Sequence, residues 1–288
     1  MRKSVLTALL LLLFPALSYA QGKDPVVLRY QYPEGKQLTY KYRNTTELDL
    51  GGISARAMIE WQSNEKLARR SGEDTLHVSV VYSDIGESIL VSSRLIQQAI
   101  FGSMADKPFQ FSISPRGALT HFIPPSAQKV DFTQLDLFEF MSANLELSHA
   151  TLFPHLPEHP VAVGDTWTTK RKHSVPYQNI GSEGSVTVSS TYTVKKAKKN
   201  KGHWGFEIEE KNEISTHVFN SFGEISVITD GKGTAKGKFF LDYERGLITK
   251  YETSAVLETE SIILTGPEQS PVKSRGKSFA KRELKKIK

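Results

Sequence analysis

The chain contains no cysteine among its 288 residues, which excludes disulfides and thiolate chemistry. It also lacks the motifs of zinc proteases, phosphate-binding loops, dinucleotide-binding folds and Gly-x-Ser-x-Gly hydrolases. Its stability must therefore come from a hydrophobic core, for which a chain of this length is sufficient. We expect no cofactor, and we favour a protein without catalytic activity.

Long apolar runs are absent except near the start of the chain. Arg2 and Lys3 precede the apolar residues 5–17, and Ser18-Tyr19-Ala20 has the small-residue pattern of a signal-peptidase site. The run is shorter than the ~20 residues that a membrane-spanning helix needs. We predict a signal peptide over residues 1–20, cleavage near Ala20, and export to the periplasm or the exterior. We expect no transmembrane segment in the mature chain.

The excess of positive charge belongs to one end of the chain. The total is +6, but residues 273–288 carry +7 and residues 21–272 carry −3. A nucleic-acid-binding domain carries its basic residues on a folded face, so no nucleic-acid partner is expected. We interpret residues 269–288 as a basic disordered tail, a candidate for binding an anionic envelope surface.

Short identities recur along the chain at one offset. Gly35 and Gly164 lie 129 positions apart, and so do Arg116-Gly117 and Arg245-Gly246. Alternating apolar and polar residues near these glycines predict strands joined by tight turns. Recurrence at a fixed spacing indicates an internal repeat, with chance reuse of glycine turns in a β-meander as the alternative.

These patterns predict a mainly β (β-rich α+β) protein. Two similar antiparallel β units, 21–130 and 161–268, would form a curved sheet or sandwich. The intervening segment 131–160 would hold a helix and a proline-rich connector. Apolar residues at helical spacing predict helices over 92–104 and 131–149, so one or two helices would pack on the sheet.

Large apolar side chains are the candidates for ligand binding. Phe138, Met141, Trp167 and Phe240 would line a cavity between sheet and helices and hold an apolar small molecule or a lipid. The alternative is that such side chains serve only the core.

Two polar patterns lack the context that their chemistry needs. The first is a group of metal-ligand residue types around several prolines: His149, His155, Glu158 and His159. Prolines prevent the helix that would place these residues on one face. The second, Ser63-x-x-Lys66, matches a serine acyl-enzyme motif but lies in a predicted strand. We predict neither a metal site nor catalytic residues.

A family resemblance rests on two stretches. A proline-rich approach leads to Val163-Gly164-Asp165-Thr166-Trp167, and residues 239–246 read Phe-x-x-Asp-x-x-x-Gly. Here the chain resembles a family of uncharacterised exported bacterial proteins with no established activity. A fainter similarity runs to periplasmic lipoprotein carriers of the LolA type. That similarity implies a curved antiparallel sheet over helices around an apolar cavity.

Two functions stay open at this stage. One is an exported, non-catalytic envelope protein that binds an apolar ligand or lipid between sheet and helices. The other is a structural or interaction protein of the cell envelope that acts through its surface and basic C-terminal tail.

Overall fold

The computed structural model describes residues 24–50, 52–71, 75–92, 94–96, 105–123, 152–174, 183–222, 225–265 and 268–288. Every regular element in these ranges is a strand. The strands are β1 (Gln37–Leu50), β2 (Ile53–Ser71), β3 (Thr75–Val91), β4 (Arg94–Ile96), β5 (Pro108–Ile113), β6 (Leu119–Ile123), β7 (Thr166–Ser174), β8 (Glu183–Asn200), β9 (His203–Phe222), β10 (Ile225–Asp242), β11 (Leu247–Thr265) and β12 (Glu268–Ile287). Within the described ranges, no helix has the length and apolar character needed to cross a membrane.

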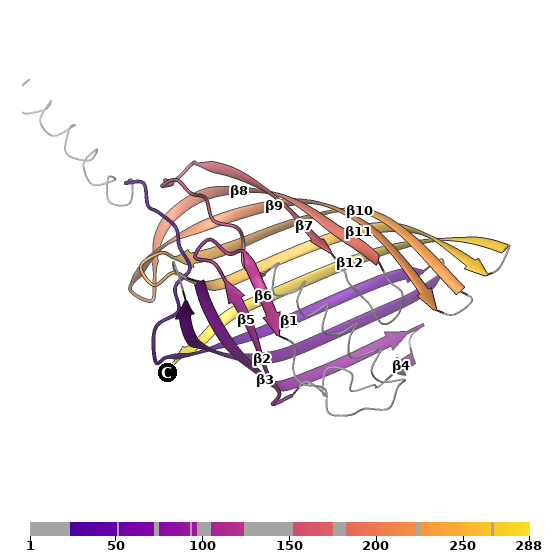
Figure 1. Ribbon diagram of the computed structural model, residues 1–288, viewed down its shortest axis with the longest axis horizontal. Coiled ribbons are helices and arrows are strands. Elements are labelled where there is room, and N and C mark those ends of the chain that lie inside the picture. The colour runs from indigo at the N-terminus through magenta and orange to yellow at the C-terminus, as the bar shows by residue number, and fades with distance from the viewer. Residues whose placement is uncertain are drawn as a thin grey trace, which may run out of the picture.

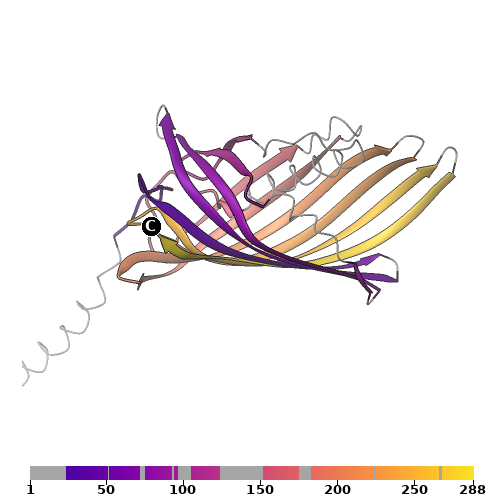
Figure 2. The same cartoon turned by 90° about the horizontal axis from the view of Figure 1, so that it is seen from below.

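All twelve strands belong to one sheet (Figure 1). Their order is β6-β5-β3-β2-β1-β12-β11-β10-β9-β8-β7, with β4 beside β3, and neighbouring strands are antiparallel. The chain therefore starts at the centre, runs to the β6 edge, resumes at the β7 edge and returns to the centre. Figure 2 shows that the sheet is strongly curved and that both edges rise on the same side, so it forms a trough.

Side chains alternate between the two faces of each strand, and the two faces differ in chemistry. The concave inner face carries the buried core, for example Leu38 and Tyr40 on β1 and Val78 and Val80 on β3. The outer face carries exposed charged residues, such as Lys41 between the two buried tyrosines of β1. This alternation is what an antiparallel sheet with one buried face requires.

Two irregular segments fill one end of the trough, which we call the closed end. Residues 24–36 and 152–161 are joined by reciprocal backbone hydrogen bonds between Val26 and Val161, of 2.8 and 2.9 Å. Between these segments and the sheet lie buried side chains: Leu28, Tyr30, Tyr32, Phe153 and Leu156. At the other end, the open end, the β1–β2, β9–β10 and β11–β12 hairpins turn (Figure 1).

The expected fold class needs correction. The described strands form a single sheet instead of a sandwich, and no helix packs on it in the part of the chain that the structure describes. Within the expected helix 92–104, Arg94–Ile96 is strand β4, paired with Ile89–Val91. A tight turn at Ser92, with φ of +45°, makes this hairpin possible. The expected helix 131–149 lies outside the described residues.

The expected disordered tail is also wrong. Residues 268–287 form β12, which pairs with β1 on one side and β11 on the other at the centre of the sheet. Its basic residues Lys273, Arg275 and Lys277 occupy the outer face, while Ser274 and Gly276 between them face inward. Charge density along the sequence therefore concealed a regular strand alternation.

The positions that share the 129-residue offset also share a backbone conformation. Gly35 and Gly164 have φ of +67° and +101° just before β1 and β7. Gly117 and Gly246 have φ of +91° and +64° in the β5–β6 and β10–β11 turns. Duplication of the unit stays a prediction, and so does export, because residues 1–23 lie outside the described residues.

Replacing Gly246 by alanine should loosen the closed end. A Cβ at this position would lie 2.5 Å from the Gln31 nitrogen and 2.7 Å from the Arg29 oxygen. Gly35→Ala is the matched control, because its φ is also positive but nothing lies within 4 Å of the added atom. By thermal unfolding we expect the control to lose about 1–2 kcal/mol from backbone strain alone. Gly246→Ala should lose clearly more, and equal losses would contradict the packing described.

Candidate functional site

A buried ion pair lies at the centre of the inner face. Arg282 of β12 is 1% exposed and Glu65 of β2 is 0% exposed, with β1 between their strands. The Arg282 Nη2 donates to both carboxylate oxygens of Glu65 at 3.0 Å. Three hydroxyls also donate to this carboxylate: Tyr32 at 2.6 Å, Tyr42 at 3.2 Å and Ser63 at 3.0 Å. The buried charges are thus both paired and hydrogen-bonded, as burial demands.

The aromatic surroundings hold Arg282 in its charged form. Its guanidinium lies 3.7 Å from the centre of the Tyr40 ring and 5.2 Å from that of Phe153, a cation–π arrangement. Burial alone would lower the pKa of Arg282, but Glu65 and the neighbouring tyrosines reverse this, and the net direction is upward. Burial raises the pKa of Tyr40 and Tyr42, so both hydroxyls stay protonated.

Aromatic side chains extend from this pair towards both edges of the sheet, and we call them the aromatic belt. Toward β6 the belt consists of Tyr42, Trp61, Tyr82, Phe109 and Phe122, with successive ring centres 4.8–5.9 Å apart. Toward β7 it consists of Tyr251, Phe239, Tyr192 and Trp167, with spacings of 5.1–6.2 Å. Each residue comes from a different strand. The belt separates the packed closed end from the rest of the inner face.

A second buried carboxyl lies beside the belt on the C-terminal half. Glu210 of β9 is 2% exposed and accepts a hydrogen bond of 2.9 Å from the Tyr251 hydroxyl. Burial raises the pKa of Glu210, and donors including Asn212 and Tyr251 oppose that shift without cancelling it. The neutral form of this carboxyl is therefore favoured more than in water.

Beyond the belt, the inner face of three central strands carries uncharged and mostly small side chains. These residues, which we call the small-residue strip, are Gly237, Ala235, Gly233, Gly231, Thr229 and Val227 on β10; Thr253, Ala255, Leu257, Thr259, Ser261 and Ile263 on β11; and Ala280, Ser278, Gly276, Ser274 and Val272 on β12. All are buried or half-buried. The opposite face of the same strands carries exposed charges such as Lys232, Glu258 and Arg275.

Hydroxyl groups in the strip bond to one another across strands. Thr229 Oγ1 and Ser261 Oγ are 2.9 Å apart, and Thr259 Oγ1 and Ser274 Oγ are 2.5 Å apart. Such pairs satisfy the polar atoms and leave methyl and methylene groups to form the surface. The strip is therefore less polar than its threonine and serine content suggests.

The structure separates two of the residues proposed to share a cavity. Trp167 lies on the inner face, stacks on Tyr192 and donates its Nε1 hydrogen to the His155 carbonyl at 2.8 Å. Phe240 lies on the outer face, with Lys198 5.6 Å above its ring. Phe138 and Met141 lie outside the described residues. The cavity lined by all four stays a prediction, and the structure does not bring Trp167 and Phe240 together.

The described residues of the polar motifs found in the sequence make contacts that stabilise the fold. Ser63 faces inward and donates to Glu65, whereas Lys66 is on the outer face, so they form no serine–lysine pair. Glu158 forms an ion pair with Arg116 across the closed end. Asp165 accepts a hydrogen bond from the Ala162 amide at 2.8 Å and so fixes the turn before β7. His149 lies outside the described residues.

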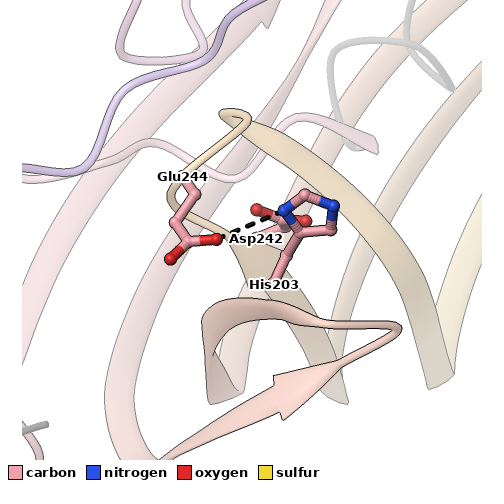
Figure 3. Close-up of side chains that lie close together, drawn as sticks. All are labelled: His203, Asp242 and Glu244. Carbon is pink, nitrogen blue, oxygen red and sulfur yellow. Dashed lines mark hydrogen bonds and ion pairs between the residues drawn. The ribbon is translucent and has the colours of Figure 1, made fainter.

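One described group offers three metal-ligand types close together. His203, Asp242 and Glu244 have ligand atoms within 4.8 Å of one another, and Figure 3 shows the His203 ring beside both carboxylates. His203 Nδ1 lies 3.2 Å from Glu244. However, the Asp242 carboxylate already receives Arg245 at 2.6 Å and the Arg245 amide at 3.0 Å. A guanidinium on the same carboxylate opposes cation binding. The contacts of Asp242 therefore stabilise the turn between β10 and β11.

Sequence reasoning missed Glu65, Arg282, Glu210 and the small-residue strip. In the sequence, Arg282 is one of many basic residues near the C-terminus, and Glu65 lies inside the Ser63-x-x-Lys66 pattern. Neither context indicates a buried charge. A signal for the strip was present, because small residues at 231, 233, 235 and 237 alternate with polar ones. What the sequence did not reveal was that β10, β11 and β12 would align these positions on one face.

Removing only one member of the buried pair should destabilise the fold strongly. Arg282→Met leaves the Glu65 charge buried without its partner and should cost about 3–5 kcal/mol of unfolding free energy. The double variant Arg282→Met with Glu65→Gln removes both charges, keeps one acceptor oxygen for the surrounding hydroxyls, and should recover part of that loss. Lys195→Met, which breaks an exposed pair with Glu209, should change stability by less than about 1 kcal/mol. Urea unfolding measures all three, and a loss for Arg282→Met no larger than that for Lys195→Met would refute the role given to the pair.

Comparison with known families and sequences gives little functional information. The model of a family of unknown function (DUF6263) matches residues 124–248. No curated protein matches the chain in sequence.

Comparison with solved structures identifies a similar fold. A chain from work on lipid–protein interactions in lipovitellin superposes with a TM-score of 0.50 at 10% identity, over 90% of this chain and 26% of that chain. This protein thus spans about a quarter of the lipovitellin chain. At that identity the likeness concerns the fold alone. Pseudomonas aeruginosa OpdK with vanillate reaches a TM-score of only 0.14 at 5% identity, covering 87% of this chain and 98% of that one, and supports no argument.

Proposed function

We propose that the protein binds the acyl chain of a lipid along the small-residue strip, without catalysing a reaction. The observation that carries the proposal is the uncharged inner face of β10, β11 and β12, whose outer face is heavily charged. Small side chains with paired hydroxyls form a wall against which a methylene chain makes close contacts. The strip adjoins the aromatic belt, which would meet one end of the bound chain.

The fold comparison supports the same proposal at a coarser level. The lipovitellin structure was described for its lipid–protein interactions, and its fold resembles that of this chain. Apolar ligand sites combine a mainly apolar wall with a few placed polar groups. Here Glu210, whose pKa is raised by burial, is hydrogen-bonded to Tyr251 of the belt on the C-terminal half.

A charge placed in the strip should abolish binding of a fluorescent fatty acid. Leu257→Glu puts a carboxylate on the inner face and should weaken binding at least about ten-fold, because desolvating that charge costs several kcal/mol. Val256→Glu is the matched control: it changes the adjacent residue of β11, which faces outward, and should bind like the unchanged protein. Fluorescence titration measures affinity, and circular dichroism checks that both variants fold.

A bulky neutral substitution provides a second test. Ser278→Phe fills the strip on β12 without burying a charge and should also weaken binding. Mass spectrometry of an organic extract of gently purified protein should find a co-purified lipid. Absence of both an extracted lipid and fatty-acid binding would refute the proposal, as would equal affinities of Leu257→Glu and Val256→Glu.

A further inference from the structure

The outer face carries an apolar row close to the open end. Phe219 of β9, Ile228 of β10, Ile262 of β11 and Pro271 of β12 lie side by side in register. Ile262 is 37% exposed. The solvent-facing side of an antiparallel sheet is normally polar. Other outward apolar residues on this half, such as Phe279 and Val256, lie singly among polar neighbours, whereas these four lie in one row. The apolar row is therefore an exception that needs a partner.

The inner face also carries apolar residues near the hairpin turns. Val227 of β10 pairs with Ile263 of β11, and Val218 and Val272 lie one inward row further from the turns, opposite Thr229 and Ser261. On the N-terminal half, exposed apolar residues occupy the strand ends: Leu48, Ile53 and Leu90, at 40%, 51% and 37% exposure. The open end thus presents apolar side chains on both faces of the sheet.

Immediately behind the apolar row, the outer face becomes a groove of paired charges. A row of charged residues lies two positions further from the turns, roughly 7 Å along each strand. It consists of residues in register: His217, Asp230, Glu260 and Lys273. The row after that, two residues further still from the turns and also on the outer face, holds Lys232, Glu258 and Arg275. These residues line a groove of about 800 Å³. Its opposite charges alternate, with Arg275 3.5 Å from Glu258 and His217 2.7 Å from Asp230.

We propose that the open end docks on the surface of a phospholipid bilayer with zwitterionic headgroups. A bilayer would cover the row and the exposed strand ends Leu48, Ile53 and Leu90 together, whereas a protein partner seated on the row would leave those strand ends uncovered. The groove supplies cations for headgroup phosphates and carboxylates for headgroup ammonium groups. Its nearly balanced charge fits a zwitterionic surface better than an anionic one.

Backbone pairing makes such an insertion possible. The antiparallel ladders continue to the last described residues, Phe222 with Ile225 and Thr265 with Glu268. A strand end can enter an apolar phase only if its backbone groups are already bonded. The charged row that contains Asp230, Glu260 and Lys273 lies directly behind the apolar row and limits the depth, so the contact lies in the interfacial zone and not in the hydrocarbon centre.

Flotation with vesicles of phosphatidylcholine and phosphatidylethanolamine tests the proposal. The unchanged protein should float, and Ile262→Asp should reduce the bound fraction about ten-fold, because it removes apolar burial and adds a charge. Phe279→Asp is the matched control: Phe279 is an outward residue, 43% exposed, far from the turns, and its loss should leave flotation unchanged. Leu257→Glu should float normally, so failure of acyl-chain binding and failure of membrane docking are separable.

A tryptophan probe provides a second readout that does not depend on a destabilising charge. Emission from Ile262→Trp should shift to shorter wavelength when these vesicles are added, and emission from Phe279→Trp should not. Failure of the unchanged protein to float would overturn the proposal, and so would equal behaviour of the two tryptophan variants. A concentration-dependent dimer that Ile262→Asp abolishes would instead assign the row to a second copy of the chain.

Discussion

The ion pair between Glu65 and Arg282 is the interaction on which the rest of the structure depends. It joins residues 217 positions apart, and it lies where the first and last strands of the chain meet at the centre of the sheet. Arg282 can be buried there because Glu65 neutralises its charge and aromatic rings enclose it. The aromatic belt then extends this fixed point to both edges. The chain begins and ends at the centre of the sheet, and this ion pair links strands from its two halves across β1.

This junction divides the molecule into two parts with different physical properties. At the closed end, two irregular segments and the belt give a packed core that accounts for stability. Toward the open end, the inner face of the described strands β10, β11 and β12 is uncharged and mostly small. Long strands that extend beyond a core leave surface for binding, which is why both functional proposals lie on this side of the belt.

The sequence predicted the parts of this fold that depend on local pattern. Strand alternation in β1 and β3 and the tight turns at Gly117 and Gly246 are present. The position of β12 was not predicted, because eight basic residues in 273–288 indicated a solvated tail. Small and basic residues alternate visibly in this segment. Local pattern alone does not reveal that it would pair with β1 and β11 and that its small residues would face inward. The same limit applies to Glu65, whose partner lies at the far end of the chain.

Hydrogen–deuterium exchange of residues 268–287 tests most directly whether the C-terminal segment is the central strand. If β12 pairs with both β1 and β11, its amides exchange only through global unfolding, as slowly as those of its two neighbours. Exchange of this segment within seconds, with β1 and β11 still protected, would contradict the account. The C-terminal segment would then be a solvated extension, and Arg282 could not be the partner of Glu65.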